Sequence, residues 1–264
     1  MKNALEFYNF FDKKLIDDYI YQNARIESAI TSLGSFIPEN SKHILDMGCG
    51  LGWSSHEFSI HFKEAKVLGI DFSPVLVDTA QKLFNNQNLE YKVFDITKEL
   101  PSNKYDVIIM MDVYEHIPVE ERHTFHESVS KILNENGRLI LACPSKFHQE
   151  WLRNNNREGL QPVDEDVDVQ TILDIAKDIK GEVIYFSYQK IWRSFDYLYA
   201  VIEVNPQYLS KSKLKYNTEI ITENIGERIK RVKENLNLTY DNIKKNKDEV
   251  ILKKILKKVI RKFI

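Results

Sequence analysis

The chain has 264 residues, of which 43% are hydrophobic and 29% charged, a composition typical of a globular protein with one large domain or one domain with additions. Its net charge of −2 is unevenly spread, because residues 211–264 hold 16 Lys and Arg against 7 Asp and Glu, whereas the rest holds 21 against 32. An acidic body with a basic tail argues against a main face that grips nucleic acid, since such a body repels phosphates.

Residues 14–34 carry apolar side chains at helical spacing, which predicts one helix, and a turn-rich segment follows. Strands and helices then alternate. Apolar runs predict strands at 43–47, 66–71, 89–95, 105–112 and within 134–144, and helical patterns lie between them at 53–62, 73–84 and 118–133. Ser73 and Pro74 occupy the expected N-cap and first position of one helix. This alternation predicts a mostly parallel sheet covered by helices on both faces.

Residues 145–166 are polar and predict an irregular loop, and loops of that length tend to be functional. A helix is predicted at 168–179. Two strands follow at 181–188 and 197–204, which we expect to pair antiparallel at the sheet edge. From about Asn205 the composition shifts to Lys, Asn, Ile and Glu, so we expect the body to end there.

The segment ILDMGCGLGW places Gly48, Gly50 and Gly52 just after the first predicted strand. In open α/β sheets ligands bind beyond the carboxyl ends of the strands, and glycine allows a tight turn with close backbone approach. An ordinary glycine-rich turn is the alternative. The spacing G-x-G-x-G departs from the dinucleotide fingerprint G-x-G-x-x-G, and the lysine of a P-loop is absent.

Acidic residues end four successive predicted strands, in the order Asp46, Asp71, Asp95 and Asp112, and Glu115 follows the last. Because these ends meet at one edge of the sheet, the mouth of the site is expected to be negative. A pyrophosphate is disfavoured there, and a ligand with a positive centre is favoured.

Five blocks in order resemble the motifs of class I S-adenosylmethionine-dependent methyltransferases: ILDMGCGLGWSSHEF, VLGIDFSP, YKVFDITKELP, YDVIIMMDVYEHIP and LNENGRLILACPS. The likeness runs from about Ser41 to Pro144. It implies an α/β, Rossmann-like, seven-stranded, mostly parallel sheet with an antiparallel last strand pair. It also implies S-adenosyl-L-methionine as the cofactor. We expect an N-terminal helical cap over the cofactor site (1–40), a catalytic domain (41–205) and a basic helical C-terminal extension (206–264).

The resemblance implies roles for residues near the first two strands. Gly48 and Gly50 are expected to pass close to the methionine part of the cofactor. Asp46 is expected to order the loop and to face the amino group, and Asp71 to hold the ribose hydroxyls. A helix cap is the alternative role for Asp71.

Further along the chain, the same resemblance implies that Phe72 and Ile96 lie against the two faces of the adenine and that Asp95 accepts from its amine. Met111 and Asp112 are expected to line the methionine end. Core packing is the alternative for Phe72 and Ile96.

Methyl transfer is an in-line displacement, so the protein chiefly aligns the nucleophile with the methyl group. A hydroxyl acceptor also needs a general base or a metal. His116 is the first candidate base and Glu115 the second catalytic candidate, with a helix cap and an ion pair as the alternatives. Tyr114 is a candidate to line the substrate pocket.

The segment 145–166 supplies candidates for substrate binding, His148 and Arg153, the latter for an anionic group. Imidazole and carboxylates are ligands for divalent metals, so a metal site is a hypothesis; the alternative is a solvated loop. Its weak candidate ligands are His148, Asp164, Glu165 and Asp166.

The pattern HQ-WL…EGLQPVDEDV in this segment resembles methyltransferases of bacterial surface-polysaccharide (capsule) pathways. That resemblance implies O-methylation of a small molecule, or of a sugar or phosphoryl group such as a phosphoramidate. The alternatives are an N-methyltransferase, a tRNA or protein methyltransferase, and an inactive cofactor-binding regulatory subunit. The signature N/D-P-P-Y/F of base-amine methylation is missing, since MDVYEH stands at that position.

The C-terminal segment KDEVILKKILKKVIRKFI predicts an amphipathic basic helix. Such a helix can lie on an anionic membrane surface, dock on a partner, or pack on its own domain or in a homodimer. With no transmembrane run, no signal peptide and two cysteines, we expect a cytoplasmic protein, with peripheral attachment at the inner membrane as an alternative.

Overall fold

The computed structural model describes residues 12–207, 220–236 and 238. Seven strands of this part form one sheet in the order β3-β2-β1-β4-β5-β7-β6. The strands are β1 (His43–Met47), β2 (Lys66–Asp71), β3 (Leu89–Val93), β4 (Tyr105–Met111), β5 (Leu133–Pro144), β6 (Gly181–Gln189) and β7 (Tyr197–Val204). Strands β1 to β5 pair in parallel, and β7 is antiparallel to both β5 and β6. The predicted fold class, including the antiparallel edge pair, is confirmed.

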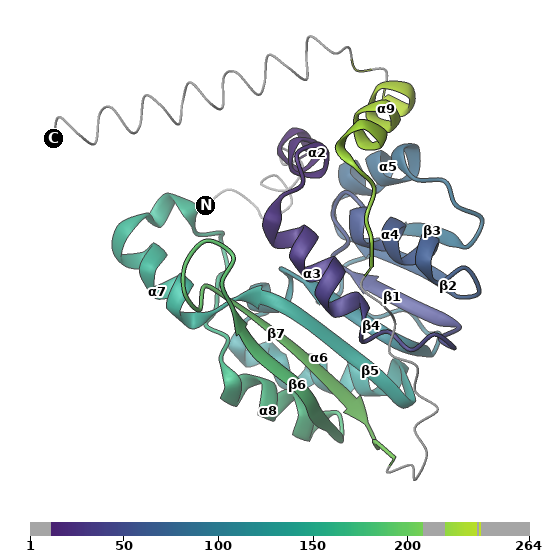
Figure 1. Cartoon of the computed structure of the whole chain (residues 1–264). Coiled ribbons are helices and arrows are strands. Elements are labelled where there is room, and N and C mark those ends of the chain that lie inside the picture. Colours follow the sequence, from purple (N-terminus) through teal and green to yellow (C-terminus); the bar gives the residue numbers. More distant parts are fainter. Residues whose placement is uncertain (1–11, 208–219, 237, 239–264) are drawn as a thin grey trace, which may run out of the picture.

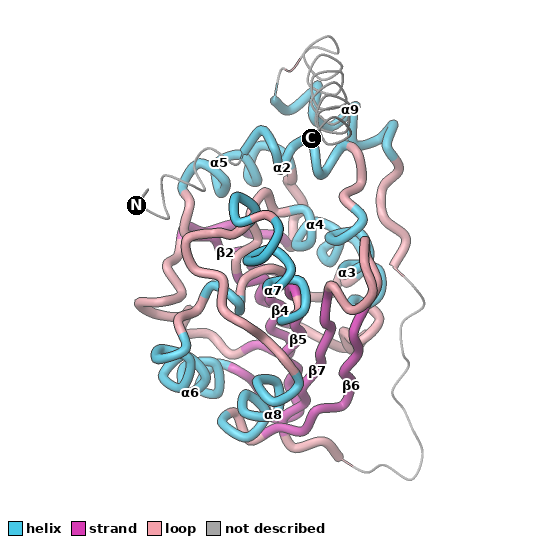
Figure 2. Tube along the Cα trace, turned by 90° about the vertical axis from the view of Figure 1, so that its left-hand side faces the viewer, coloured by secondary structure: helices cyan, strands magenta, loops and turns pink. Residues whose placement is uncertain are grey.

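Helices cover both faces of the sheet (Figures 1 and 2). They are α2 (Asp12–Ile20), α3 (Ala24–Gly34), α4 (Trp53–His61), α5 (Pro74–Leu83), α6 (Arg122–Ile132), α7 (Lys146–Asn155), α8 (Val169–Asp178) and α9 (Ile225–Leu236), with short 3-10 turns at Tyr114–His116, Val119–Glu121 and Arg157–Gly159. One hydrophobic core cluster lies between one face of the sheet and the helices α2, α3, α4 and α5. A second lies between the other face and the helices α6 and α8. This two-sided burial explains why the central strands are apolar throughout.

The single helix predicted over residues 14–34 is in fact two helices, α2 and α3. Between them Gln22 has a positive φ of 53°, and the Asn23 side chain accepts from the backbone N–H of Arg25 at 3.1 Å. Asn23 is therefore an N-cap that starts a new helix. The apolar spacing continues across the break, which is why the pattern predicted one element.

The loop predicted over 145–166 contains helix α7. Ser145 caps this helix by accepting from the backbone N–H of His148. Only Gln149 and Leu152 on α7 are buried. Phe147, Trp151 and Leu152 recur at helical spacing, but the segment around them is mostly polar, so the sequence was interpreted as a loop.

Residues 220–236 pack against helices from the N-terminal half of the chain. Helix α9 contacts α2 and α5, and Ile220 fills the space beside Gly34, where a Cβ would lie 2.1 Å from Ile220 Cδ1. The predicted basic helix near the C-terminus lies outside the described residues, and the division into three parts stays a prediction. In the described ranges, no helix has the length and apolarity that crossing a membrane requires.

Candidate functional site

The glycine loop between β1 and α4 has the backbone conformation that its sequence suggests. Gly48, Gly50 and Gly52 all have positive φ, at 68°, 53° and 85°. A Cβ on Gly48 would lie 2.4 Å from Val113 Cγ2, and one on Gly52 would lie 2.6 Å from the ring of Tyr91. A side chain is therefore disfavoured by both conformation and space at Gly48 and Gly52, and by conformation alone at Gly50.

Asp71, at the end of β2, ties this loop to the start of α5. Its Oδ2 accepts from the backbone N–H of Gly50 and its Oδ1 from that of Ser73, each at 2.9 Å. The residue is 7% exposed. Burial raises the pKa of Asp71 to about 6, although the backbone hydrogen bonds oppose the rise. Asp71 thus sets the shape of the loop and borders the cavity described next.

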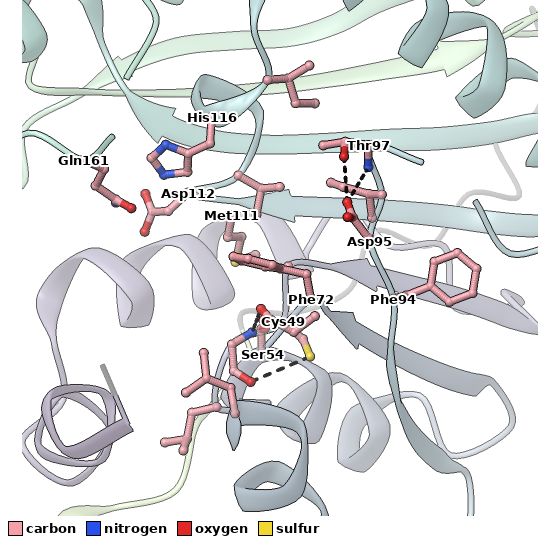
Figure 3. A pocket seen from close by; sticks show the side chains of 18 of the residues that line it. Cys49, Ser54, Phe72, Phe94, Asp95, Thr97, Met111, Asp112, His116 and Gln161 are labelled. Atoms are coloured by element: carbon pink, nitrogen blue, oxygen red, sulfur yellow. Dashed lines mark hydrogen bonds between the residues drawn. The ribbon is translucent and has the colours of Figure 1, made fainter. Parts of the chain in front are cut away.

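A cavity of about 810 Å³ opens beyond the carboxyl ends of β1 to β4, walled on one side by α2 and α3. In Figure 3, Asp112, His116 and Gln161 lie at one end, Phe94 and Asp95 at the other, and Phe72 and Met111 between them. Nearly all predicted cofactor residues line this cavity: Gly48, Gly50, Asp71, Phe72, Asp95, Ile96, Met111 and Asp112.

Asp46 is the predicted cofactor residue that does not line the cavity. It is 1% exposed, and its Oδ2 accepts from the hydroxyls of Ser54 and Ser55 at 2.5 and 2.6 Å. Burial raises its pKa to about 6, with the two serines opposing. Asp46 therefore orders the start of α4 behind the cavity wall.

Asp95 is held in place at the far end of the cavity. The hydroxyl and backbone N–H of Thr97 donate to its Oδ1 at 2.7 and 3.1 Å, and Lys98 lies 2.8 Å from its Oδ2. Burial acts to raise the pKa of Asp95, but the bonds from Lys98 and Thr97 outweigh it and the pKa is lowered. Asp95 is thus a fixed, ionised acceptor.

Asp112, after β4, forms the centre of the other end. It has a positive φ of 57°, its Oδ2 lies 3.1 Å from Arg25 Nε, and the Tyr197 hydroxyl donates to its Oδ1. Burial raises the pKa of Asp112, and Arg25 opposes the rise. The sequence did not single out Arg25 or Tyr197, because each comes from an element distant in the chain. The one feature that could have indicated Arg25 is its position in the N-terminal segment expected to cover the cofactor site.

His116 lines the same end and has a defined orientation. Its Nδ1 lies 2.6 Å from the carbonyl oxygen of Val163 and 3.3 Å from Asp164 Oδ1. A carbonyl oxygen only accepts, so we assign the proton of the neutral ring to Nδ1. The unprotonated Nε2 lies 3.7 Å from Glu115 Oε1.

Glu115 and Tyr114 are buried beside the cavity and do not line it. The Oε2 of Glu115 has no hydrogen-bond partner among the described residues, and burial raises the pKa of this carboxyl well above its ordinary value. Tyr114, predicted to line the substrate pocket, instead pairs its hydroxyl with His126 Nε2 at 2.9 Å. Its side chain belongs to the core under α6.

The two candidates from segment 145–166 lie outside the cavity lining. The His148 ring is half-buried, with its centroid 6.3 Å from those of Trp151 and Trp192. Both Nη2 contacts of Arg153 go to the carboxylate of Asp166, at 2.8 and 2.9 Å.

The four weak candidate metal ligands do not converge. Asp164 faces His116 and Asp166 pairs with Arg153, while the backbone N–H of Glu165 donates to the Glu115 carbonyl. In the part of the chain that the structure describes, no group of three or more His, Cys, Asp or Glu is placed to hold a metal ion.

Residues 44–137 match a protein-family model described as a methyltransferase domain. The ubiquinone biosynthesis O-methyltransferase of Coxiella burnetii is 30% identical over 132 residues, which are 48% of this chain and 51% of that protein. The chain thus spans about half the length of this curated relative.

Solved structures show the same fold. An S-adenosylmethionine-dependent methyltransferase from Mesorhizobium loti aligns with a TM-score of 0.54 at 17% identity, covering 65% of this chain and 95% of that one. Magnesium protoporphyrin IX methyltransferase from Synechocystis PCC 6803, with bound SAH, aligns with a TM-score of 0.55 at 20% identity, covering 70% and 83%.

Proposed function

We propose that this chain is an S-adenosylmethionine-dependent methyltransferase. The observation that carries the proposal is the cavity at the strand ends, which combines a side-chain-free glycine loop with the carboxylates of Asp71, Asp95 and Asp112. Its cationic side chains are compensated, because Lys98 lies against Asp95 and Arg25 against Asp112. Such a cavity suits a ligand with a positive sulfonium centre and disfavours a pyrophosphate.

The residues present fit the parts of this cofactor. The Asp71 oxygens accept from the backbone N–H groups of Gly50 and Ser73, and a carboxylate has further lone pairs that can accept a ribose hydroxyl. Phe72 and Ile96 offer apolar surfaces for the adenine, and Asp95 an acceptor for its amine. The close approach at Gly48 and Gly50 admits the methionine part.

The bound cofactor would supply an activated methyl group on its sulfonium. At that end of the cavity the chain contributes His116, whose Nδ1–H is held by Val163 and Asp164. The Nε2 is buried 3.7 Å from Glu115 Oε1, so the ring would have to turn this atom toward an acceptor hydroxyl before it could take the proton. Asp112, fixed by Arg25 and Tyr197, keeps the methionine end in one place. This arrangement favours O-methylation.

For the acceptor we infer a sugar or phosphoryl group, including a phosphoramidate, in surface-glycan (capsule) biosynthesis. The support is the pattern HQ-WL…EGLQPVDEDV in segment 145–166, and the O-methylating relative from Coxiella burnetii agrees with transfer to oxygen. N-methylation, a tRNA or protein acceptor and a regulatory subunit without turnover are the competing proposals. A cytoplasmic location, a homodimer and contacts of the basic tail with a membrane or partner stay predictions.

The test is a methyl-transfer screen on the full chain, with formation of S-adenosylhomocysteine as the readout. Nucleotide-sugars, small phosphoryl compounds and bulk tRNA serve as acceptors, each with and without Mg²⁺ or Mn²⁺. Turnover with a sugar or phosphoryl compound is the expected result. Turnover with tRNA alone would contradict the proposed acceptor, and cofactor binding without turnover on any acceptor would favour the regulatory subunit.

A further inference from the structure

Five aromatic side chains gather outside the cavity, where α7 lies beside the loop between β6 and β7 (Figure 1). We call them the aromatic shelf: Phe147, Trp151, Tyr188, Trp192 and Phe195. Phe147, Trp192 and Phe195 are 45%, 53% and 57% exposed. The ring of Phe147 has its centroid 5.5 Å from Tyr188 and 6.2 Å from Phe195. Grouped exposed aromatic surface of this kind marks binding sites.

The loop that carries two of these rings is rigidly held. The buried carboxylate of Asp196 accepts from the backbone N–H groups of Ile191, Trp192 and Arg193 at 2.7 to 2.9 Å. Phe195 follows at a positive φ of 63°, which is unfavourable for a bulky residue. A strained backbone that presents an apolar ring to solvent points to a function for that ring.

A polar hollow of about 470 Å³ adjoins the shelf along α7. It shares Phe147 with the shelf, and its polar lining residues are Lys146, Glu150, Arg153, Asn154, Arg157 and Asp166. Two of its cations are already compensated, since Arg153 pairs with Asp166 and Lys146 with Asp168. The hollow therefore offers mixed hydrogen-bond donors and acceptors without a strong excess of charge.

The shelf contacts the wall of the main cavity through Tyr197, which is 1% exposed. The ring of Trp192 meets that of Tyr197 edge-on at 6.5 Å, and the Tyr197 hydroxyl donates to Asp112. His148 lies between the Trp192 and Trp151 rings. A ligand resting on the shelf would thus lie on the outer side of the wall that holds Asp112.

We propose that the aromatic shelf and the polar hollow together bind a neutral saccharide, so that the methyl acceptor is a sugar within an oligosaccharide. A pyranose ring has an apolar C–H face that stacks on aromatic rings and a rim of hydroxyls that need mixed donors and acceptors. A polyanion would find two of the hollow's three cations already paired with carboxylates, and a lipid would leave the hollow without partners. This inference rests on the proposed function, and it narrows the acceptor from any small sugar or phosphoryl compound to a glycan.

The test measures binding of the full chain to an array of bacterial surface oligosaccharides. The variant is Trp192→Ala, and the matched control is Ile184→Ala, which removes a side chain 39% exposed on neighbouring β6. The unmodified chain and Ile184→Ala should bind at least one neutral oligosaccharide. Trp192→Ala should bind it about tenfold more weakly, with S-adenosylhomocysteine affinity within about twofold of the unmodified chain.

Absence of oligosaccharide binding, or binding that survives Trp192→Ala, would overturn the inference. So would binding confined to acidic polysaccharides or to anionic lipid vesicles. Calorimetry with S-adenosylhomocysteine separates the two claims. If that ligand binds and no glycan does, the saccharide site is wrong and the proposed function stands; if that ligand fails to bind, the proposed function itself fails.

Discussion

Asp71, at the end of β2, links the glycine loop to the start of α5, because its carboxylate oxygens accept from Gly50 and from Ser73. The residue also lines the cavity. The same carboxylate can therefore shape the loop and hold a ribose.

We predict that Asp71→Ala weakens binding of S-adenosylhomocysteine by about 1–3 kcal/mol, the usual cost of losing charge-assisted hydrogen bonds. Isothermal titration calorimetry measures the change. Asp78→Ala, an exposed acid on α5 paired with Lys82, is the control and should bind normally. Unchanged affinity in Asp71→Ala would remove the ribose assignment.

His116→Ala should lower turnover by roughly 10²–10⁴, the usual contribution of a general base. Its affinity for S-adenosylhomocysteine should stay within about twofold, since the base acts on the acceptor. Initial rates with the acceptor found in the screen provide the measurement, and His123→Ala, on the exposed side of α6, is the control. Near-normal turnover would leave His116 a structural residue that holds Val163 and Asp164.

Individual site residues were predictable from sequence where they sit at strand ends. Asp71, Asp95 and Asp112 end or follow apolar runs, so their meeting at one cavity follows from a parallel sheet. Contacts across elements were not predictable: nothing in the pattern pairs Arg25 with Asp112, or turns Tyr114 toward His126. Those pairings depend on how helices pack after the sheet forms.

At the scale of elements, α9 holds the helices that wall the cavity. Arg228 is fully buried, and it donates to the Tyr19 carbonyl at 3.0 Å, to Glu27 Oε2 at 3.0 Å and to the Glu223 carbonyl at 2.7 Å. Its guanidinium also lies 4.4 Å from the ring centroid of Trp53, which lines the cavity. One arginine thus joins α9 to α2, α3 and the start of α4.

We predict that Arg228→Met lowers the free energy of unfolding by about 3–5 kcal/mol, because it leaves buried acceptors and Glu27 without their cation. Urea denaturation measures this loss. Relative to the unmodified chain, the substitution should also speed amide hydrogen exchange more in residues 12–20 of α2 than in the central strands. Lys230→Met, on the exposed side of α9, is the matched control. A variant as stable as the control would show that α9 does not anchor α2.

Glu57 on α4 supplies a pH-dependent test. Burial raises its pKa from 4.5 to about 7, although Arg228 opposes the rise. The folded protein therefore binds the Glu57 proton more tightly than the unfolded chain does. This contribution to the free energy of unfolding is fully present below about pH 4.5 and is lost as the pH rises through about 7.

Relative to Glu57→Gln, the unmodified chain should therefore lose up to about 3 kcal/mol of unfolding free energy between those pH values, since one pKa unit is about 1.4 kcal/mol. Paired urea denaturation curves at several pH values provide the measurement. Parallel pH profiles for the two proteins would contradict the raised pKa.

Elements with a strong apolar pattern were predictable, and those held by polar contacts were not. The strands β1 and β2 lie where HILDM and KVLGID predicted them. Helix α7 was missed because its segment is mostly polar, and the break at Gln22 was missed because one residue of positive φ leaves no periodicity signal.

On the scale of the whole molecule, the strand order places the cavity. From β1 the strands are added through β2 to β3 on one side and through β4 to β5 on the other. The direction in which strands are added therefore switches between β1 and β4. Ligands in open α/β sheets bind at such a switch point. The alternation of strands and helices predicts the fold class, whereas the order of the strands was not predicted and comes from the structure.

Binding of the cofactor is the most direct measurement of the central claim, that this cavity takes a sulfonium ligand and rejects a pyrophosphate. The full chain is titrated by calorimetry with S-adenosylmethionine and, separately, with NAD. We predict one S-adenosylmethionine bound per chain with micromolar affinity and no heat from NAD. Absence of S-adenosylmethionine binding, or tighter binding of NAD, would contradict the account.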